Sequence, residues 1–280
     1  MKENLNIYEL SKEYLVGQTM RLFECDETRA IEIVNEYSNT PNVTTLSFAS
    51  ILEELASTLQ TGQSLPNVIN YLNRKNDLRR IFKNYNPQLL GEADEDELFT
   101  ECVQTFGECV NNGKRSWKIY IGGMVDGASI LKRFDNVQSF IDAINAFENT
   151  HGLTFEQYQD VMPTKMRASK GTNNWKIYGM KNALACNFLK EIGFANYVKP
   201  DTHLKAAFDA VELPYTSDDD CLRIGRELAA SYNVTPYALD RVIWLCCSGH
   251  YYRHTQNKLG GGSKKLKDPY LDYLKEKNQE

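Results

Sequence analysis

Hydrophobic residues recur along much of the chain with the spacing of an amphipathic helix. Two stripes are clear, and they consist of Phe140, Ile141, Ile144 and Phe147, and of Leu204, Ala207, Phe208 and Val211. Side chains at positions i, i+3, i+4 and i+7 lie on one face of a helix. The pattern therefore predicts helices around 140–147 and 202–211, each with one face toward a core.

Residues that cap helices support these predictions and add further helices. Ser217, followed by Asp220, is typical of a capping box and predicts a helix through Leu228. Thr235-Pro236 supplies an N-cap and a proline at the first helical position of a helix that runs through Leu245. Asp201 is suited to cap the helix Thr202–Val211, and another helix is predicted from about Lys181 to Glu191.

Strand signals are scarce, so the fold class predicted is all-α. The best candidate is the alternating run Trp117–Ile121. Because one isolated strand cannot make a sheet, we interpret this run as loop or helix. Loops are predicted near 61–66, 86–96, 110–115, 168–174 and 258–266.

Composition and charge limit the classes of function. The chain has 280 residues, 42% hydrophobic and 25% charged, which suits a large globular domain or two lobes. Its net charge of -5 gives no global basic field, so any DNA contact must come from local patches. Acidic residues interrupt the N-terminal stretch, which excludes a signal peptide, and no apolar run reaches the roughly 18 residues of a membrane span. We expect a soluble, cytoplasmic protein with no membrane partner.

The seven cysteines are odd in number and irregular in spacing, and no C-x2-C pair occurs among them. A zinc knuckle or a redox motif is therefore not predicted, and core thiols are the simpler interpretation. Cys102 and Cys109 are seven residues apart, on one face of a predicted helix. We expect no metal site.

Two short motifs carry the main indication of function. Gly179-Met180-Lys181-Asn182-Ala183 forms a turn before a helix, and Lys199-Pro200-Asp201-Thr202-His203 places Asp201 twenty residues beyond Lys181. Together they resemble the helix-hairpin-helix DNA glycosylases, the superfamily of endonuclease III, the 8-oxoguanine glycosylases and the alkyladenine glycosylases. Members that also cleave the strand carry G-x-G-x-K-[TV]-A, followed about twenty residues later by V-D-[TV]-H.

The resemblance implies a two-lobed helical fold with a central cleft for an extruded nucleotide. A six-helix lobe, residues 44–185, would end in the hairpin, and 1–43 plus 186–280 would form the lobe that carries Asp201. The partner implied is double-stranded DNA with a damaged or modified base. The protein would act as a monomer associated with the nucleoid.

Two features depart from the family pattern. The first glycine of the family's hairpin falls on Ile177, although that glycine lets backbone N–H groups approach a DNA phosphate closely. The hairpin is therefore reshaped, or it no longer grips phosphate in the same way. The family's C-terminal iron–sulfur motif is also absent, so we expect neither a cluster nor another cofactor.

The resemblance assigns the chemistry to Asp201 and Lys181. Breaking an N-glycosidic bond builds positive charge on the sugar, which a nearby carboxylate stabilises; Asp201 would do this and orient or deprotonate the nucleophile. Lys181, in the first turn of its helix and partly buried, would have a lowered pKa, and its amine would form a Schiff base that allows strand cleavage. The alternatives left open are that Asp201 only caps a helix and that Lys181 only binds phosphate.

Further residues are expected to contact DNA. They are Lys176, Tyr178 and Gly179 in the hairpin, Lys199 and His203 beside the aspartate, and Gln60, the candidate for the residue that fills the gap left by the extruded base. Gln63 is the alternative to Gln60, a helix-end glutamine needs no DNA role, and His203 is favoured as a structural hydrogen-bonding residue. Trp175 is the candidate base-pocket residue because, of the three tryptophans, it lies in the most polar surroundings, although core packing is the default for each.

Three basic stretches would supply the phosphate contacts. One holds Lys165, Arg167, Lys170, Lys176, Lys181, Lys190, Lys199 and Lys205; the second holds Arg253, His254, Lys258, Lys264, Lys265 and Lys267; the third holds Arg74, Lys75, Arg79, Arg80 and Lys83. Each taken singly is also compatible with a solvated helix face.

The sequence thus predicts a DNA glycosylase, with AP-lyase activity if Lys181 forms the Schiff base. The first alternative is a non-catalytic DNA-binding or lesion-sensing protein on the same scaffold, and the second is a helical protein–protein module. Oxidised, deaminated, alkylated and virus-type hypermodified bases all remain open as targets, as does a repair or an antiviral role.

Overall fold

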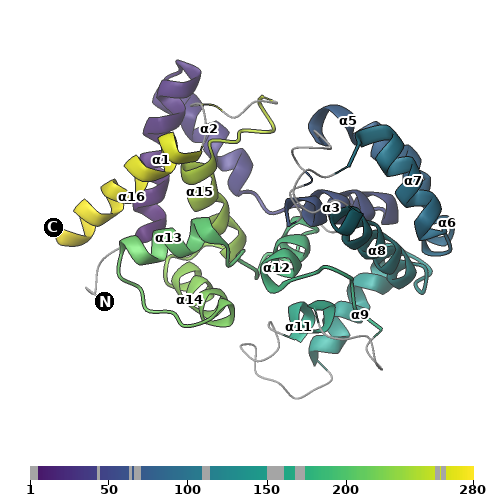
Figure 1. Ribbon diagram of the computed structural model, residues 1–280. Helices are drawn as coiled ribbons and strands as arrows, with labels where there is room; N and C mark the ends of the chain where they lie inside the picture. The colour runs from purple at the N-terminus through teal and green to yellow at the C-terminus, as the bar shows by residue number, and fades with distance from the viewer. Residues whose placement is uncertain are drawn as a thin grey trace. The chain divides into compact units, whose positions relative to one another are not determined.

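The computed structural model describes residues 6–42, 45–62, 65, 71–108, 114–149, 161–167, 174–255, 259 and 263–280. All regular secondary structure within these residues is helical, which confirms the predicted all-α class (Figure 1). No described helix is both long enough and apolar enough to cross a membrane.

The chain forms two compact units. Unit 1 consists of Met1–Pro41 and Phe194–Glu280, and unit 2 of Asn42–Gly193. The predicted lobes were divided at 43/44 and 185/186. The second division differs because α12 (Asn182–Glu191) packs against helices of unit 2 on both sides, α3 and α11.

Unit 1 is built around the packing of its N-terminal helices on its C-terminal helices. Its helices are α1 (Ile7–Phe23), α2 (Glu27–Ser38), α13 (Thr202–Ala210), α14 (Asp218–Ser231), α15 (Pro236–Ser248) and α16 (Ser263–Gln279). Buried hydroxyl pairs join α1 to the C-terminal part, at Ser11 Oγ–Tyr270 Oη (2.7 Å) and Thr19 Oγ1–Tyr251 Oη (2.8 Å). Ser11 and Thr19 also donate to the carbonyls of Ile7 and Leu15, so each pair continues a hydrogen-bond chain within the core.

Unit 2 is arranged around α8. Its helices are α3 (Phe48–Thr61), α5 (Tyr71–Ile81), the 3-10 helix η2 (Lys83–Tyr85), α6 (Pro87–Gly91), α7 (Glu95–Phe106), α8 (Lys114–Leu131), α9 (Val137–Asn149), α11 (Val161–Arg167) and α12. Helix α8 packs against α3, α6 and α7.

The run Trp117–Ile121 lies within α8, so its alternation does not indicate a strand. Trp117, Tyr120, Ile121 and Met124 are all buried, and they follow the i, i+3, i+4, i+7 spacing of a helix. The helical period becomes visible only when the run is extended beyond Ile121.

Side-chain caps begin the helices where the sequence predicts. Ser217 Oγ accepts the Asp220 N–H at 3.1 Å, and Thr235 Oγ1 accepts the Ala238 N–H at 3.1 Å. The capping box at Ser217 is only half formed, because the Asp220 carboxylate accepts hydrogen bonds from Thr216 instead. Both helices run three residues past their predicted ends, to Ser231 and Ser248.

Several predicted loops are wrong in part. Residues 86–96 contain α6, which begins at the Asn86-Pro87 cap, and the start of α7, where Asp94 is the cap. Within 110–115, α8 already begins at Lys114, and within 258–266, α16 begins at Ser263. Residues 63–64, 66, 110–113, 168–173, 258 and 260–262 lie outside the described part.

The described cysteines carry free thiols, and only Cys25 among them is partly exposed. Cys102 and Cys247 are fully buried, and burial raises the pKa of each thiol to about 12. Thiols in such surroundings stay protonated and unreactive at neutral pH. This environment matches the prediction of core thiols; Cys109 lies outside the described residues.

Candidate functional site

Asp201 stands immediately before α13 and caps it, as predicted. Its Oδ1 accepts the N–H of His203 at 2.8 Å and that of Leu204 at 3.3 Å. Its Oδ2 lies 3.2 Å from Lys199 Nζ, and the Asp201 and Lys199 side chains are 19% and 18% exposed. One carboxylate oxygen is thus held by the helix start while the other meets a cation close to the surface.

Competing effects set the charge of Asp201. Burial raises the pKa of its carboxyl, but the charges of Lys199 and His203 and the backbone hydrogen bond from His203 together lower the pKa below its usual value of 3.8. The side chain is therefore an anion at neutral pH. A carboxylate with a low pKa is a poor proton acceptor, so this environment favours charge stabilisation over the deprotonation of a nucleophile.

The segment that leads to Asp201 is tied to α14 and α15. The Lys199 N–H donates to Asp240 Oδ1 on α15 at 2.8 Å, and Asp240 is only 5% exposed. Arg226 on α14 donates its Nε–H to the Asn196 carbonyl at 3.1 Å. Nothing local in the sequence marks Asp240 and Arg226, because they support a segment that is distant from them along the chain.

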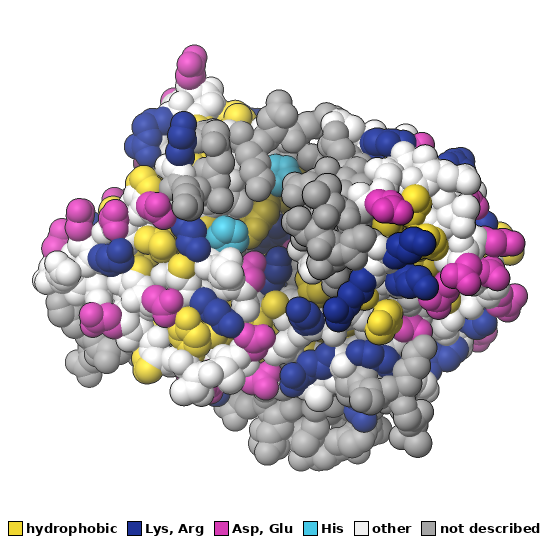
Figure 2. Space-filling model, viewed as in Figure 1, with side chains coloured by type: hydrophobic (Ala, Val, Ile, Leu, Met, Phe, Trp, Pro, Cys, Tyr) yellow, Lys and Arg dark blue, Asp and Glu magenta, His cyan; other side chains and the backbone are white. Residues whose placement is uncertain are grey.

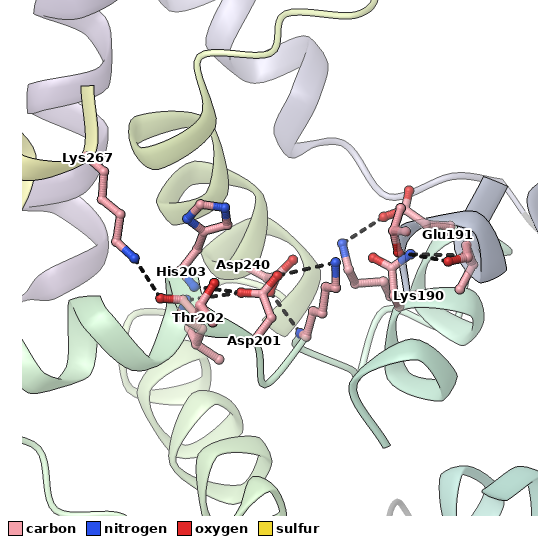
Figure 3. A network of polar contacts seen from close by, with 12 residues as sticks. Lys190, Glu191, Asp201, Thr202, His203, Asp240 and Lys267 are labelled. Carbon is pink, nitrogen blue, oxygen red and sulfur yellow. Dashed lines mark hydrogen bonds and ion pairs between the residues drawn. The ribbon is translucent and has the colours of Figure 1, made fainter. Parts of the chain in front are cut away.

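Figure 3 shows the network that surrounds Asp201. On α16, Lys267 donates to the carbonyl of Thr202 at 2.9 Å, so the first turn of α13 is held from this side as well. His203 is partly buried at the start of the same helix. Lys267, predicted only as one member of a basic stretch, thus has a definite contact beside Asp201. Figure 3 also draws the Lys190–Glu191 pair, which belongs to unit 2.

The hairpin motif forms a turn between α11 and α12 in unit 2. Gly179 has a φ of +77°, a value that glycine adopts easily, and Tyr178 is 50% exposed. The Tyr178 N–H donates to Asp126 Oδ2 on α8 at 2.9 Å. One backbone donor of the turn is therefore bound to a carboxylate of the protein itself.

Two glycines of α8 let the turn approach the helix closely. A Cβ at Gly122 would lie 2.9 Å from Tyr178 Cδ1, and a Cβ at Gly123 would lie 2.7 Å from the Tyr178 carbonyl oxygen. Larger residues at either position would push the turn away. The Gly122-Gly123 pair thus forms the seat of the hairpin turn.

Ile177, where the resemblance would place a glycine, is a core residue. It is 2% exposed, and with Phe140, Met166 and Phe188 it lines a small apolar cavity. Isoleucine at this position therefore has a packing role, and it anchors one side of the turn in the core.

Lys181 is the N-cap residue of α12, one position before the helix. Its side chain is exposed, so the partial burial expected for it is absent. The amine is accessible to a ligand, in keeping with either of the two roles considered for it. Lys176, on the other side of the turn, donates to the Arg167 carbonyl at 2.7 Å.

Two other candidates are less accessible than a DNA contact requires. Gln60, on the last turn of α3, is 6% exposed, so it is not presented to a ligand in this conformation. Gln63 lies outside the described residues. Trp175 is 8% exposed, with its ring 5.9 Å from that of Phe134 and 6.1 Å from that of Phe140. The expectation that it is the least core-like tryptophan is wrong, because Trp244 is the more exposed.

Several described side chains of the basic stretches are paired with acidic residues of the protein. Lys190 is 2% exposed and bonded to Glu191 at 2.7 Å, so it is no phosphate contact. In the stretch after Gln60, Arg74 pairs with Asp77, Arg79 lies 4.0 Å from Glu53, and Arg80 and Lys83 pair with Glu101. On the face seen in Figure 2, basic and acidic side chains are interspersed over most of the described surface.

Within the described residues, no group of three or more histidine, cysteine or acidic side chains is placed to hold a metal ion. No family model, no curated protein and no solved structure matches this chain.

Proposed function

We propose that this protein is a DNA glycosylase of the helix-hairpin-helix type, in which Asp201 is the catalytic carboxylate. The observation that carries the proposal is the state of Asp201. It is an anion at the start of a helix, with a lowered pKa, near the surface and beside a lysine. The hairpin turn with Gly179 and the exposed Lys181 are the supporting features.

The reaction suits such a carboxylate. As the N-glycosidic bond breaks, its electron pair leaves with the base and positive charge develops on the sugar. An anion held by helix N–H groups does not need to reorganise, so it stabilises that charge at little additional cost. Water then adds to the sugar carbon and its proton passes to solvent or base. Asp201 orients this water and stabilises the cation.

Lys199 and Lys181 have different parts in the proposal. Lys199 balances the charge of Asp201 before DNA binds, and a DNA phosphate offers its ammonium group an alternative partner. Lys181 supplies the amine of a Schiff base or a contact to phosphate. If it forms the Schiff base, its nitrogen bonds to the sugar carbon as the base leaves, and elimination then breaks the strand.

The primary test uses duplex oligonucleotides that each carry one oxidised, deaminated, alkylated or hypermodified base. We expect abasic sites from at least one substrate, and a decrease of about 10²–10⁴-fold in the rate for Asp201→Asn. Asparagine is as good an N-cap as aspartate, so the variant is expected to fold. A thermal unfolding curve close to that of the wild type is the control.

Two outcomes would contradict the proposal. If no substrate loses a base while the protein binds DNA in a salt-dependent way, the non-catalytic DNA-binding alternative replaces it. If Asp201→Asn releases base at the wild-type rate, the carboxylate is structural. Borohydride trapping separates the roles of Lys181: an adduct that is lost in Lys181→Gln supports the amine, and one that survives this change excludes it.

A further inference from the structure

One carboxylate outside the Asp201 network accepts a backbone N–H of the hairpin turn. Asp126 lies on α8 and accepts the Tyr178 N–H at the turn before Gly179. Backbone N–H groups in turns with a left-handed residue are common anion-binding elements. Here the acceptor is the Asp126 carboxylate, whose Oδ2 lies 2.9 Å from the Tyr178 nitrogen.

The surroundings of the turn explain why this contact forms. The turn is pressed onto Gly122 and Gly123, so its N–H faces α8, where Asp126 is one turn further along. Ile177 anchors the turn in the core on its other side. The hydrogen bond is only partly shielded, since Tyr178 is half exposed and Asp126 is partly exposed. A ligand phosphate can approach this point, but it meets a negative charge.

We infer that Asp126 is a positioning residue that holds the hairpin turn in the place of a DNA phosphate. The inference rests on the proposed function and goes beyond it. Unit 2 then contacts the DNA backbone through the exposed lysine side chains of this region, Lys181 and Lys118, rather than through the Tyr178 amide. Asp126 fixes the turn before DNA arrives and excludes a phosphate from its amide.

The inference makes a quantitative prediction for the affinity for DNA. A backbone N–H carries no net charge, so its contact with a phosphate adds a hydrogen bond but releases no further counterion. Asp126→Ala removes the acceptor and frees the Tyr178 N–H for a phosphate. We expect Asp126→Ala to bind DNA about tenfold more tightly than Asp126→Asn, with the same dependence on salt, because a hydrogen bond to a charged group contributes about 1.5 kcal/mol.

Two variants distinguish the effect of freeing the Tyr178 N–H from the effect of removing a negative charge. Asp126→Asn removes the charge but keeps an oxygen that accepts the Tyr178 N–H. Glu95→Gln removes a carboxylate that also lies beside the seat, 3.5 Å from where a Cβ of Gly122 would be. Both variants are expected to bind DNA only somewhat more tightly than the wild type, through reduced repulsion. If they gain as much affinity as Asp126→Ala does, or if Asp126→Ala gains none, the inference is wrong.

A readout without DNA keeps the inference independent of the proposed function. Amide hydrogen exchange at Tyr178, followed by NMR, is expected to be about tenfold faster in Asp126→Ala, since loss of a bond worth about 1.4 kcal/mol gives that factor. Asp126→Asn should stay near the wild-type rate. Faster exchange without any DNA binding would leave the positioning role intact and overturn the glycosylase proposal. Unchanged exchange would overturn the positioning role itself.

Discussion

Asp201 in unit 1 and Asp126 in unit 2 both place a carboxylate against backbone N–H groups, but they do so in different ways. Asp201 binds the N–H groups of the helix that it begins, and a lysine meets its second oxygen. Asp126 reaches from the middle of one helix to the turn before another. The second oxygen of Asp201 forms an ion pair near the surface, whereas Asp126 holds a turn. The same interaction, a carboxylate that accepts backbone N–H groups, thus positions a candidate catalytic group in unit 1 and fixes a turn in unit 2.

The two regions also differ in what their glycines approach. At Gly123, an added Cβ would meet the Tyr178 carbonyl oxygen at 2.7 Å, while at Gly225 it would meet the Val198 side chain at 2.8 Å. Backbone cannot move aside without shifting the whole turn, whereas a side chain has some freedom. Gly123, beneath the hairpin turn, should therefore tolerate substitution less well than Gly225, which supports the segment before Asp201.

The largest effect on stability is expected for Gly123→Ala. Overpacking against the Tyr178 carbonyl and Leu59 should lower the free energy of unfolding by about 2–3 kcal/mol, even though alanine is the better helix former. Gly17→Ala is the matched control, because only Arg21 Nη1 lies near, at 3.9 Å. That variant should gain up to about 1 kcal/mol. Denaturant unfolding measures both, and equal effects would contradict the role of the seat.

A smaller loss is expected for Gly225→Ala in unit 1. Displacement of Val198 should cost about 1–2 kcal/mol and shift the segment that carries Lys199 and Asp201. Base excision should then decrease more than stability alone explains at temperatures where the variant is fully folded. A decrease of stability with an unchanged rate would show that this segment does not need its support.

Two replacements of Asp201 distinguish the contribution of its helix cap to stability from the contribution of its charge. Asp201→Ala removes the acceptor for the His203 and Leu204 N–H groups and should lower the free energy of unfolding by about 1 kcal/mol. Asp201→Asn should cost less, because it still caps α13, although it loses the ion pair with Lys199. Thermal unfolding of the two variants tests this order, and the reverse order would contradict it.

The smallest effect expected is a dependence on pH that belongs to Asp201. A carboxyl whose pKa is lowered by folding contributes stability above its unfolded value, and that stability is lost as the pH falls through the folded value. The wild type should exceed Asp201→Asn in stability near neutral pH. This difference should shrink below about pH 3.8, the ordinary pKa of the group. Denaturation curves at several pH values test this, and a difference that grows on acidification would reverse the sign of the shift.

Local signals in the sequence were the reliable ones. Ser217, Thr235 and Asp201 begin helices where predicted, because a cap depends on atoms three residues apart. The Asn86-Pro87 start of α6 carries the same signal as Thr235-Pro236, yet the polar residues around it favoured a loop. A cap followed by proline should therefore outweigh the polarity of its neighbours.

What the sequence did not reveal depends on packing between distant segments. The burial of Ile177, Trp175 and Lys190 follows from neighbours that no local pattern identifies. The partners of the two carboxylate regions, Asp240 for Lys199 and Asp126 for Tyr178, are 41 and 52 residues away along the chain. The motifs located the two candidate regions, and the fold supplied the contacts that hold them.

The discontinuity of unit 1 has a consequence for how the protein is made. Helices α1 and α2 pack against α15, with α1 also meeting α16, and all of unit 2 lies between these segments in the chain. On the ribosome, unit 2 is therefore complete before α1 and α2 have their partners. Helices α1 and α2 are made before α15 and α16 and keep apolar faces uncovered until then, so a chaperone that binds nascent chains would find a target there.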